Sequence, residues 1–172
     1  MQAPARPADE DIRIDTLQAL KILDTSAEER FDRLTRIAAK LFSVPIALVS
    51  LVDEDRVWFK SAKGMNEAGS PRDTSFCGHA ILGDDVFLIA DTSRDERFSD
   101  NPHVTGGPMV RFYAGAPLKA ADGSTLGTLC LMDKKPREFS EEDQSLLRDL
   151  AHMAERELAA SAMATMDELT ML

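Results

Sequence analysis

Two pairs of strand-like segments, each joined by a short polar turn, restrict this chain to a largely antiparallel sheet. The first pair is the almost uninterrupted apolar run Ile46–Val52 and segment 57–64, with Asp-Glu-Asp-Arg between them. The second pair is segments 110–120 and 124–133, joined by Ala-Asp-Gly. Short turns are typical of hairpins, whereas parallel strands need long crossovers. Because only segment 86–91 stands alone, we predict an α+β fold rather than a doubly wound nucleotide fold.

Helical periodicity surrounds these strands. A short helix is expected around residues 14–21, and a second is expected to start at a capping box formed by Thr25 or Ser26 with a glutamate three residues later and to stop before Pro45. The apolar run 46–52 then indicates a strand that is covered on both faces. A third, short helix has Asp73, Thr74 or Ser75 as its N-cap and ends by Gly83.

A long C-terminal helix begins at Ser140, which forms a capping box with Asp143. Its apolar positions recur every three or four residues, at Leu147, Ala151, Ala154, Leu158, Ala162, Met166 and Leu169. We therefore expect one continuous helix over residues 144–169. Beyond about Leu158 we expect no domain surface to cover this stripe, so the helix should pair with a second copy in a weak, parallel homodimer.

Composition excludes several classes of partner. The chain has 172 residues and a formal net charge of −10, which disfavours binding to nucleic acid or to an anionic membrane. Neither a signal peptide nor an apolar stretch long enough to span a bilayer is visible, so we predict a cytoplasmic protein. In that reducing compartment the two cysteines are expected to be free thiols. The polar loop 92–107 is long enough to be functional or to contain short helical turns.

Six stretches in order resemble the GAF family of bacterial small-molecule sensing domains: "ILDTSAEERFDRLTRIAAKLF", "PIALVSLVDEDRVWFKS", "DTSFCGHAI", "IADTSRDERFSDNPHV", "RFYAGAPLKAADGSTLGTLCLMD" and "PREFSEEDQSLLRDLA". The resemblance covers residues 20–158. It implies a central antiparallel sheet of about five to six strands with helices on both faces, and a ligand cavity between the sheet, the Ser75 helix and loop 92–107. We accordingly predict a flexible leader (1–10), a GAF sensory domain (11–158) and a helical connector (159–172).

The terminal residues "DELTML" (167–172) resemble the start of diguanylate cyclase domains, which typically read Asp-x-Leu-Thr-x-Leu before an Asn-Arg pair. This resemblance implies a C-terminal output domain that makes cyclic di-GMP and acts as a dimer. The chain itself stops before any nucleotide-binding or metal-binding segment of a cyclase. We therefore expect that it is not an enzyme and makes no cyclic di-GMP by itself.

Cys77 is the residue with the clearest chemical potential. Near the N-terminus of a short helix its thiolate would be favoured by backbone N–H groups, which would make it redox-sensitive. The alternative is a buried cysteine that acts as a small hydrophobe, an interpretation that is stronger still for Cys130. His79 either lines the cavity or caps the helix end. The Cys77 and His79 side chains point to nearly opposite faces of a helix, so we predict no metal site.

The aromatic and charged residues around the implied cavity complete the candidate site. Arg111 and Tyr113 lie on an alternating strand with one face towards it, where an aromatic with a polar tip is equally well a core residue. Asp91 and Phe98 belong to the loop that closes it, and a solvated charge network anchored by Phe98 is a stronger interpretation of these two residues than ligand binding. We predict an unidentified small-molecule ligand, no catalytic residue and no nameable cofactor. The predicted ligand-binding residues are Phe59, Ser75, Phe76, Cys77, His79, Asp91, Phe98, Arg111 and Tyr113.

Two other functions compete with the sensory one. Some GAF-fold proteins are free methionine sulfoxide reductases, but that family uses three cysteines in a different context, whereas this chain has two. The other is a structural dimerisation module whose cavity is filled by its own side chains. The cyclic-nucleotide signature of the GAF family (Asn-Lys…Phe…Asp-Glu) is missing, and so is the Cys-His pair that holds bilins, because Gly78 separates Cys77 from His79.

Overall fold

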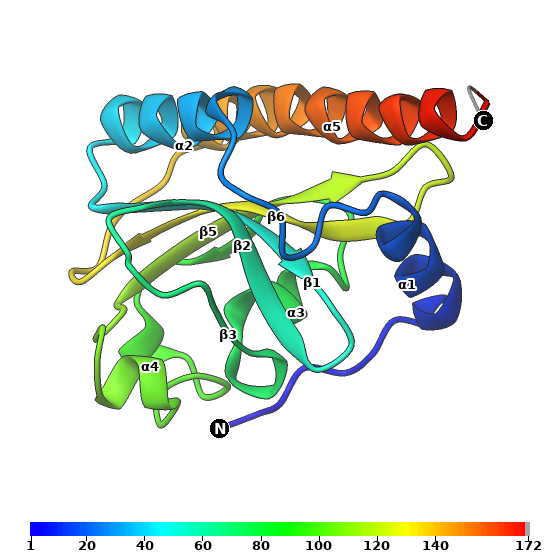
Figure 1. The fold of residues 1–172 in the computed structure, drawn as a ribbon. Coiled ribbons are helices and arrows are strands. Elements are labelled where there is room, and N and C mark those ends of the chain that lie inside the picture. The colour runs from blue at the N-terminus through cyan, green and yellow to red at the C-terminus, as the bar shows by residue number, and fades with distance from the viewer. Residues whose placement is uncertain (171–172) are drawn as a thin grey trace.

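The computed structural model describes the backbone of residues 1–170 and the side chains of residues 1–165. Its centre is a six-stranded, fully antiparallel sheet in the order β3-β2-β1-β6-β5-β4 (Figure 1). The two predicted hairpins are present and pair with each other through the two central strands. The strands are β1 (Ile46–Val52), β2 (Arg56–Lys63), β3 (Gly69–Pro71), β4 (Phe87–Ile89), β5 (Phe112–Lys119) and β6 (Thr125–Asp133). This architecture confirms the predicted α+β fold.

The helices form a layer on each side of the sheet (Figure 1). Helices α2 and α5 cover one face, α3 and α4 lie on the other, and α1 packs near one end of β6. Loop 92–107 contains two short helical turns, as expected for its length. The helical elements are α1 (Glu10–Ala19), α2 (Glu29–Phe42), η1 (Arg72–Thr74), α3 (Phe76–Ala80), η2 (Thr92–Arg94), α4 (Pro102–Thr105) and α5 (Glu141–Thr170).

Strand β1 divides two apolar cores. Ala47, Val49 and Leu51 belong to the core beneath α2 and α5, whereas Leu48 and Val52 belong to the core beneath α3. Successive side chains of a strand point to opposite faces, so a strand between two covered faces must be apolar throughout. All seven residues of β1 are buried, which confirms the prediction made from this run.

The two predicted capping boxes have different outcomes. The Asp143 amide donates to Ser140 Oγ at 3.1 Å and the Ser140 amide donates to the Asp143 carboxylate at 3.0 Å, so the start of α5 is confirmed. The prediction for α2 is wrong, because this helix begins at Glu29 without a side-chain cap. The buried Lys60 ammonium instead donates hydrogen bonds to Thr25 Oγ1 at 2.8 Å and to the Ser26 carbonyl at 2.6 Å. These bonds fasten β2 to the α1–α2 connection.

Helix α5 is continuous from Glu141 to Thr170, as predicted, but its cover extends further than expected. Beyond Leu158, Arg30 donates to Ser161 Oγ at 2.6 Å and Ala162 packs on the core beneath α2. The expectation that no domain surface remains after Leu158 is therefore wrong, because the α1–α2 connection and the start of α2 lie against this part of α5. Residues 171–172 of the terminal motif lie outside the described residues.

The predicted flexible leader lies along the molecule and contacts it. The Gln2 amide donates to the Arg97 carbonyl at 3.1 Å, and His79 Nε2 lies 3.0 Å from the Gln2 carbonyl. A Cβ on Gly78 would lie only 2.7 Å from Pro4 Cγ, so the close approach of the leader depends on glycine there. None of the helices in the described part of the chain has the length and apolar character that a bilayer crossing requires.

Candidate functional site

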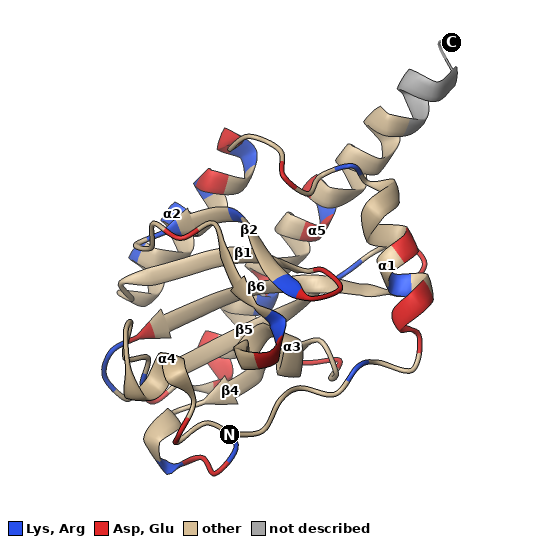
Figure 2. Cartoon of the chain, turned by 60° about the horizontal axis from the view of Figure 1, so that its bottom comes forward, with Lys and Arg blue, Asp and Glu red and all other residues tan. Residues whose placement is uncertain are grey.

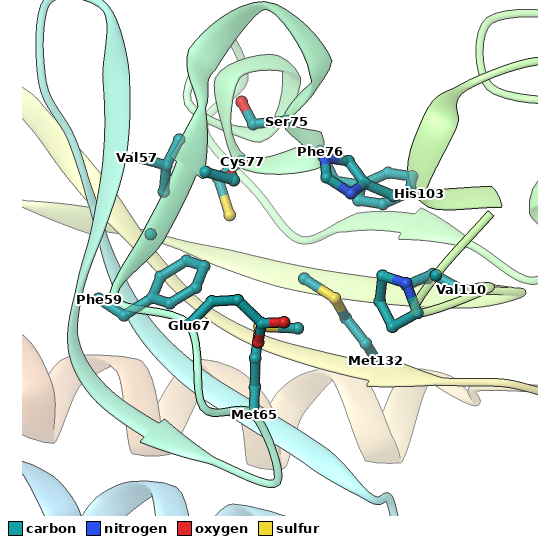
Figure 3. A pocket seen from close by; sticks show the side chains of 14 residues that line it. Val57, Phe59, Met65, Glu67, Ser75, Phe76, Cys77, His103, Val110 and Met132 are labelled. Carbon is teal, nitrogen blue, oxygen red and sulfur yellow. The ribbon is translucent and has the colours of Figure 1, made fainter.

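A pocket of about 130 Å³ lies between α3, strand β2, the edge strand β3, and the segment that precedes β5. Figure 3 shows rings, thioethers and the Cys77 thiol around the same space. The pocket is thus bounded by the elements that the sequence resemblance implied, with the addition of β3. It is lined by Val57, Phe59, Met65, Glu67, Gly69, Ser70, Ser75, Phe76, Cys77, His103, Gly107, Pro108, Val110 and Met132.

Ser75 fixes helix α3 over this pocket. Its hydroxyl accepts from the Gly78 amide at 3.0 Å and donates to the Arg72 carbonyl at 2.7 Å, which confirms it as the N-cap. Arg72 is itself buried and donates to the Glu10 carboxylate and to the carbonyl of Asp53. The first turn of α3 is therefore held from α1 and from the β1–β2 turn, and this places Phe76 and the next residue on the pocket wall.

Glu67 and His103 supply most of the polarity of the pocket. Glu67 belongs to the exposed β2–β3 connection and brings a carboxylate to the lining. His103 comes from α4, and its Nε2 lies 3.0 Å from Thr74 Oγ1. Burial lowers the pKa of His103, so its neutral form is favoured. The remaining wall is mainly aliphatic, aromatic or thioether, which suits a small molecule with an apolar body and one polar group.

Behind the pocket wall, Cys77 belongs to a buried cluster of sulfur and hydroxyl groups. Tyr113 and Thr128 each donate a hydroxyl hydrogen to Cys77 Sγ at 3.3 Å. Cys130 Sγ lies 4.0 Å from Cys77 Sγ and 3.7 Å from Ser50 Oγ. Contact with the Cys130 thiol and these hydroxyl donors outweigh burial and lower the pKa of the Cys77 thiol to about 6.

The strand register explains why these groups meet. In the antiparallel ladders Ser50 is opposite Thr128, and Cys130 is opposite Gly115. Their side chains therefore project from the α3 face of adjacent central strands. A Cβ on Gly115 would lie 2.3 Å from the Tyr113 hydroxyl oxygen, so the absence of a side chain lets the tyrosine lie back along its own strand.

Four of the nine predicted site residues line this pocket, namely Phe59, Ser75, Phe76 and Cys77. Tyr113 lies one layer deeper, where it stacks on Phe76 at 5.2 Å between ring centroids and reaches the thiol. The other four predicted residues do not line it.

Those four residues have contacts that shape the fold around the pocket. The His79 ring lies edge-on to the Phe98 ring at 4.8 Å, and its Nε2 faces the leader carbonyl described above. Asp91 accepts from the Ser93 amide at 3.0 Å and caps η2. Arg111 donates to the Val104 carbonyl at 2.7 Å. Phe98 is fully buried and Arg111 is half-buried, so they hold loop 92–107 against the sheet.

Most of the lining residues that the sequence did not indicate come from irregular segments. Met65, Glu67, Gly69 and Ser70 lie in or beside the short edge strand β3, and His103 lies in the one-turn helix α4. Val57, Val110 and Met132 have the periodicity of ordinary core positions, so no local signal separates them from other apolar residues. Among the described residues, no group of three or more His, Cys, Asp and Glu side chains is placed to hold a metal ion.

Solved structures share this architecture. The free methionine-R-sulfoxide reductase of Neisseria meningitidis, solved in complex with its substrate, aligns with a TM-score of 0.65 and 20% identity over 95% of this chain and 99% of that one. The GAF domain of an Acinetobacter phosphoenolpyruvate-protein phosphotransferase gives a TM-score of 0.61 and 20% identity over 92% and 98% of the two chains. At these identities the likeness shows the fold alone.

Sequence comparisons give one curated relative and one family. The cyclic di-GMP phosphodiesterase PA2567 of Pseudomonas aeruginosa is 43% identical over 154 residues, which cover 89% of this chain and 26% of that protein. The chain thus spans about a quarter of the length of this curated relative. The profile of the GAF domain matches residues 26–158, most of the chain and the whole six-stranded sheet. The chain belongs to the GAF domain family.

Proposed function

We propose that this chain is a sensory module that binds a small ligand beneath α3 and signals through α5 to an output domain. The observation that carries the proposal is the apolar pocket of about 130 Å³ on one face of a sheet whose other face is covered by α5. Pockets for drug-sized ligands occupy roughly 300–1,000 Å³, so the ligand is smaller than a cyclic nucleotide or a bilin.

The pocket lining favours one kind of ligand. The Glu67 carboxylate stabilises a cationic or hydrogen-donating group, and Val57, Phe59 and Met132 cover an apolar body. A signal requires that the ligand bind two arrangements of the module unequally, since equal affinity shifts nothing. The apolar side chains of β1 and β6 pack against both helical layers. A displacement of α3 against the sheet therefore shifts the side chains that pack beneath α5.

Short branched amines are the first probes, with the matched carboxylic acids as the charge control. We expect isobutylamine to raise the melting temperature of the chain more than isobutyrate does. Ser70→Phe should abolish this difference by filling the pocket from its mouth, and Gln18→Phe on the exposed side of α1 should preserve it. An equal response of the two variants would place binding outside this pocket and contradict the proposal.

We further propose that the output concerns cyclic di-GMP. Two observations support this: the relative PA2567 is a cyclic di-GMP phosphodiesterase, and residues 167–172 resemble the start of a diguanylate cyclase domain. Synthesis and breakdown are opposite reactions, so the two observations differ on the enzyme and agree on the nucleotide. We expect no turnover of GTP or cyclic di-GMP by these 172 residues alone. Both reactions should be measured with the chain joined to the proposed output domain. The cytoplasmic location stays a prediction.

A weak homodimer through the terminal helices completes the proposal. Residues 158–165 contain no charged side chain, and Figure 2 shows this uncharged end of α5 extending past the sheet. Met163 is 66% exposed, whereas Ala162 at the preceding position packs against the domain. The outer face of this segment therefore offers a narrow apolar strip to a second copy.

Truncation is a poor test of this dimer, because Leu158 is a core residue. Met163→Glu changes only the exposed strip, and sedimentation should show weaker self-association. Met153→Glu introduces the same charge at a position of α5 that is 48% exposed and lies outside the uncharged segment. Equal association of Met163→Glu and the unmodified chain would place the interface elsewhere.

A further inference from the structure

The two cysteines of the chain are 53 positions apart in sequence and in contact in the fold. Cys77 comes from α3 and Cys130 from the central strand β6, and their sulfur atoms are 4.0 Å apart. Both thiols are free and buried, so no other thiol competes for either. The S–S bond of a disulfide is about 2.05 Å long, which leaves an approach of roughly 2 Å to complete.

We infer that Cys77 and Cys130 form a reversible dithiol switch, which a small hydroperoxide oxidises after entering through the pocket beneath α3. Cys77 lines that pocket, whereas Cys130 does not, so a molecule that enters the pocket meets Cys77 first. Figure 3 shows the Cys77 sulfur among the lining side chains. The pocket is too small for a protein thiol and large enough for hydrogen peroxide or a short alkyl hydroperoxide.

The surrounding hydroxyl groups distinguish the two sulfurs. Cys77 Sγ accepts hydrogen bonds from both Tyr113 and Thr128, and such donors stabilise a thiolate. Cys130 Sγ lies 3.7 Å from the Ser50 hydroxyl, a longer contact. The Cys130 thiol and these hydroxyl donors lower the pKa of Cys77, whereas burial raises the pKa of Cys130 well above its ordinary value. Cys77 is therefore the attacking thiolate and Cys130 the resolving thiol.

The reaction balances with peroxide as the oxidant. The Cys77 thiolate attacks one peroxide oxygen, the O–O bond breaks, and the hydroxide that leaves takes up the proton that Cys77 had released, which gives a sulfenic acid and one water. Cys130 then gives up its proton while its sulfur attacks Cys77 Sγ. The S–O bond breaks, and hydroxide leaves with that proton as a second water. Two thiols are oxidised to a disulfide, and one hydrogen peroxide is reduced to two waters.

Closing the bond draws α3 towards β6. The first turn of α3 supplies Phe76 and Cys77 to the pocket wall, so oxidation changes the shape of the pocket. This last consequence rests on the proposed ligand-binding function, whereas formation of the disulfide does not. A dithiol reductant cleaves the disulfide and restores the two free thiols.

Intact-mass spectrometry tests the switch directly. The folded chain is treated with hydrogen peroxide, blocked with N-ethylmaleimide and weighed. We expect the mass to fall by two hydrogens with no label bound, and dithiothreitol to restore two labelled thiols. Cys130→Ser should instead stop at a sulfenic acid on Cys77 that dimedone traps, and Cys77→Ser should give neither product. Circular dichroism identifies any variant that fails to fold.

Tyr113→Phe separates a role in thiol chemistry from a role in packing. It removes one of the two donors to Cys77 Sγ, so the pH at which oxidation reaches half its maximal rate should rise while the disulfide still forms. An unchanged pH profile in this folded variant would remove the hydroxyl cluster from the mechanism and overturn that part of the inference.

Two results would overturn the switch as a whole. One is a wild-type chain that bridges only after denaturation. The other is a chain that free methionine sulfoxide oxidises and peroxide does not, which would identify a sulfoxide reductase instead. If the disulfide forms but isobutylamine raises the melting temperatures of Ser70→Phe and Gln18→Phe equally, the switch stands and the proposed ligand site fails.

Discussion

Gly115 decides where the Tyr113 side chain lies. A methyl group at this position would lie 2.3 Å from the tyrosine hydroxyl oxygen and 2.8 Å from its Cζ, distances that no side chain contact tolerates. The ring is fully buried and packs on the rings of Phe76 and Phe87. A single missing Cβ on β5 thus sets the position of a hydroxyl that reaches the thiol on α3.

We predict that Gly115→Ala lowers the free energy of unfolding by about 2 kcal/mol, because an overpacked core must shift backbone or leave preferred rotamers. Urea denaturation measures the change. Gly83→Ala is the matched control, since a Cβ there meets nothing within 4 Å, and its effect should stay within about 0.5 kcal/mol. A loss of the same size in both variants would contradict the steric explanation.

The Glu10 carboxylate, in the first turn of α1, accepts hydrogen bonds from two buried arginines. Arg13 Nε donates to its carboxylate at 3.0 Å, and so does Arg72 Nη2. Burial acts to raise the pKa of Glu10, but the hydrogen bonds from Arg72 and Arg13 outweigh it and lower the pKa to about 2. The ordinary value is 4.5, so the carboxylate binds protons less readily in the folded chain than in the unfolded one.

The lowered pKa of Glu10 makes the stability of the folded chain depend on pH in the acidic range. Stability from Glu10 is fully present above about pH 4.5 and is lost as the pH falls towards 2. We predict that Glu10→Gln costs about 2 kcal/mol at pH 7 and that the difference from wild type shrinks over this acidic range. Asp11→Asn, on the exposed side of the same helix, is the control. A difference that stays constant down to pH 2 would rule out this carboxylate as the titrating group.

Helix α5 is attached to the domain by side chains that neither helix periodicity nor capping signals indicate. Arg30, on the first turn of α2, donates to the Glu157 carbonyl at 2.6 Å and to Ser161 Oγ at 2.6 Å. Its Nε donates to Glu28 at 3.0 Å, which holds the guanidinium in place. The part of α5 past Leu158 is thus fastened to the α1–α2 layer rather than projecting freely from the domain.

We predict that Arg30→Gln loosens α5 locally and leaves the sheet unchanged. Loss of these hydrogen bonds should cost about 1 kcal/mol of local stability, which is roughly a fivefold increase in amide exchange over residues 157–165. Hydrogen exchange read by mass spectrometry measures it. Arg33→Gln, exposed on the same helix, should leave exchange unchanged, and faster exchange throughout the chain would indicate global unfolding instead.

At the scale of the whole molecule, the net charge of −10 opposes self-association of the uncharged end of α5. If two copies associate along this strip, added salt screens the electrostatic repulsion between them. It weakens no ion pair across the interface, because the strip carries no charged side chain. We predict that the dimer dissociation constant falls when ionic strength rises from about 0.01 M to about 0.3 M. Sedimentation velocity at both salt concentrations measures it. Weaker association in high salt would indicate an interface held by ion pairs.

Features that depend on neighbouring residues were predictable from the sequence alone. The hairpins, the fully buried strand β1, the Ser140 cap and the continuous α5 follow from periodicity and turn chemistry over a few positions. The resemblance of six stretches added the family and the side of the sheet on which a cavity lies. Each of these features has a local physical signal, because backbone conformation is set largely by nearby side chains.

Contacts between groups that are distant in sequence became visible in the folded chain and not before. Lys60 donates to Thr25 Oγ1, one of the hydroxyl oxygens expected to cap α2, and the three-residue strand β3 forms because β2 offers it a partner edge. The contact of Cys77 with Cys130, and the pocket residues of the β2–β3 connection, depend likewise on how the strands align. Such contacts require the closure of long loops, whose outcome depends on the packing of the whole core and leaves no periodic trace in the residues involved.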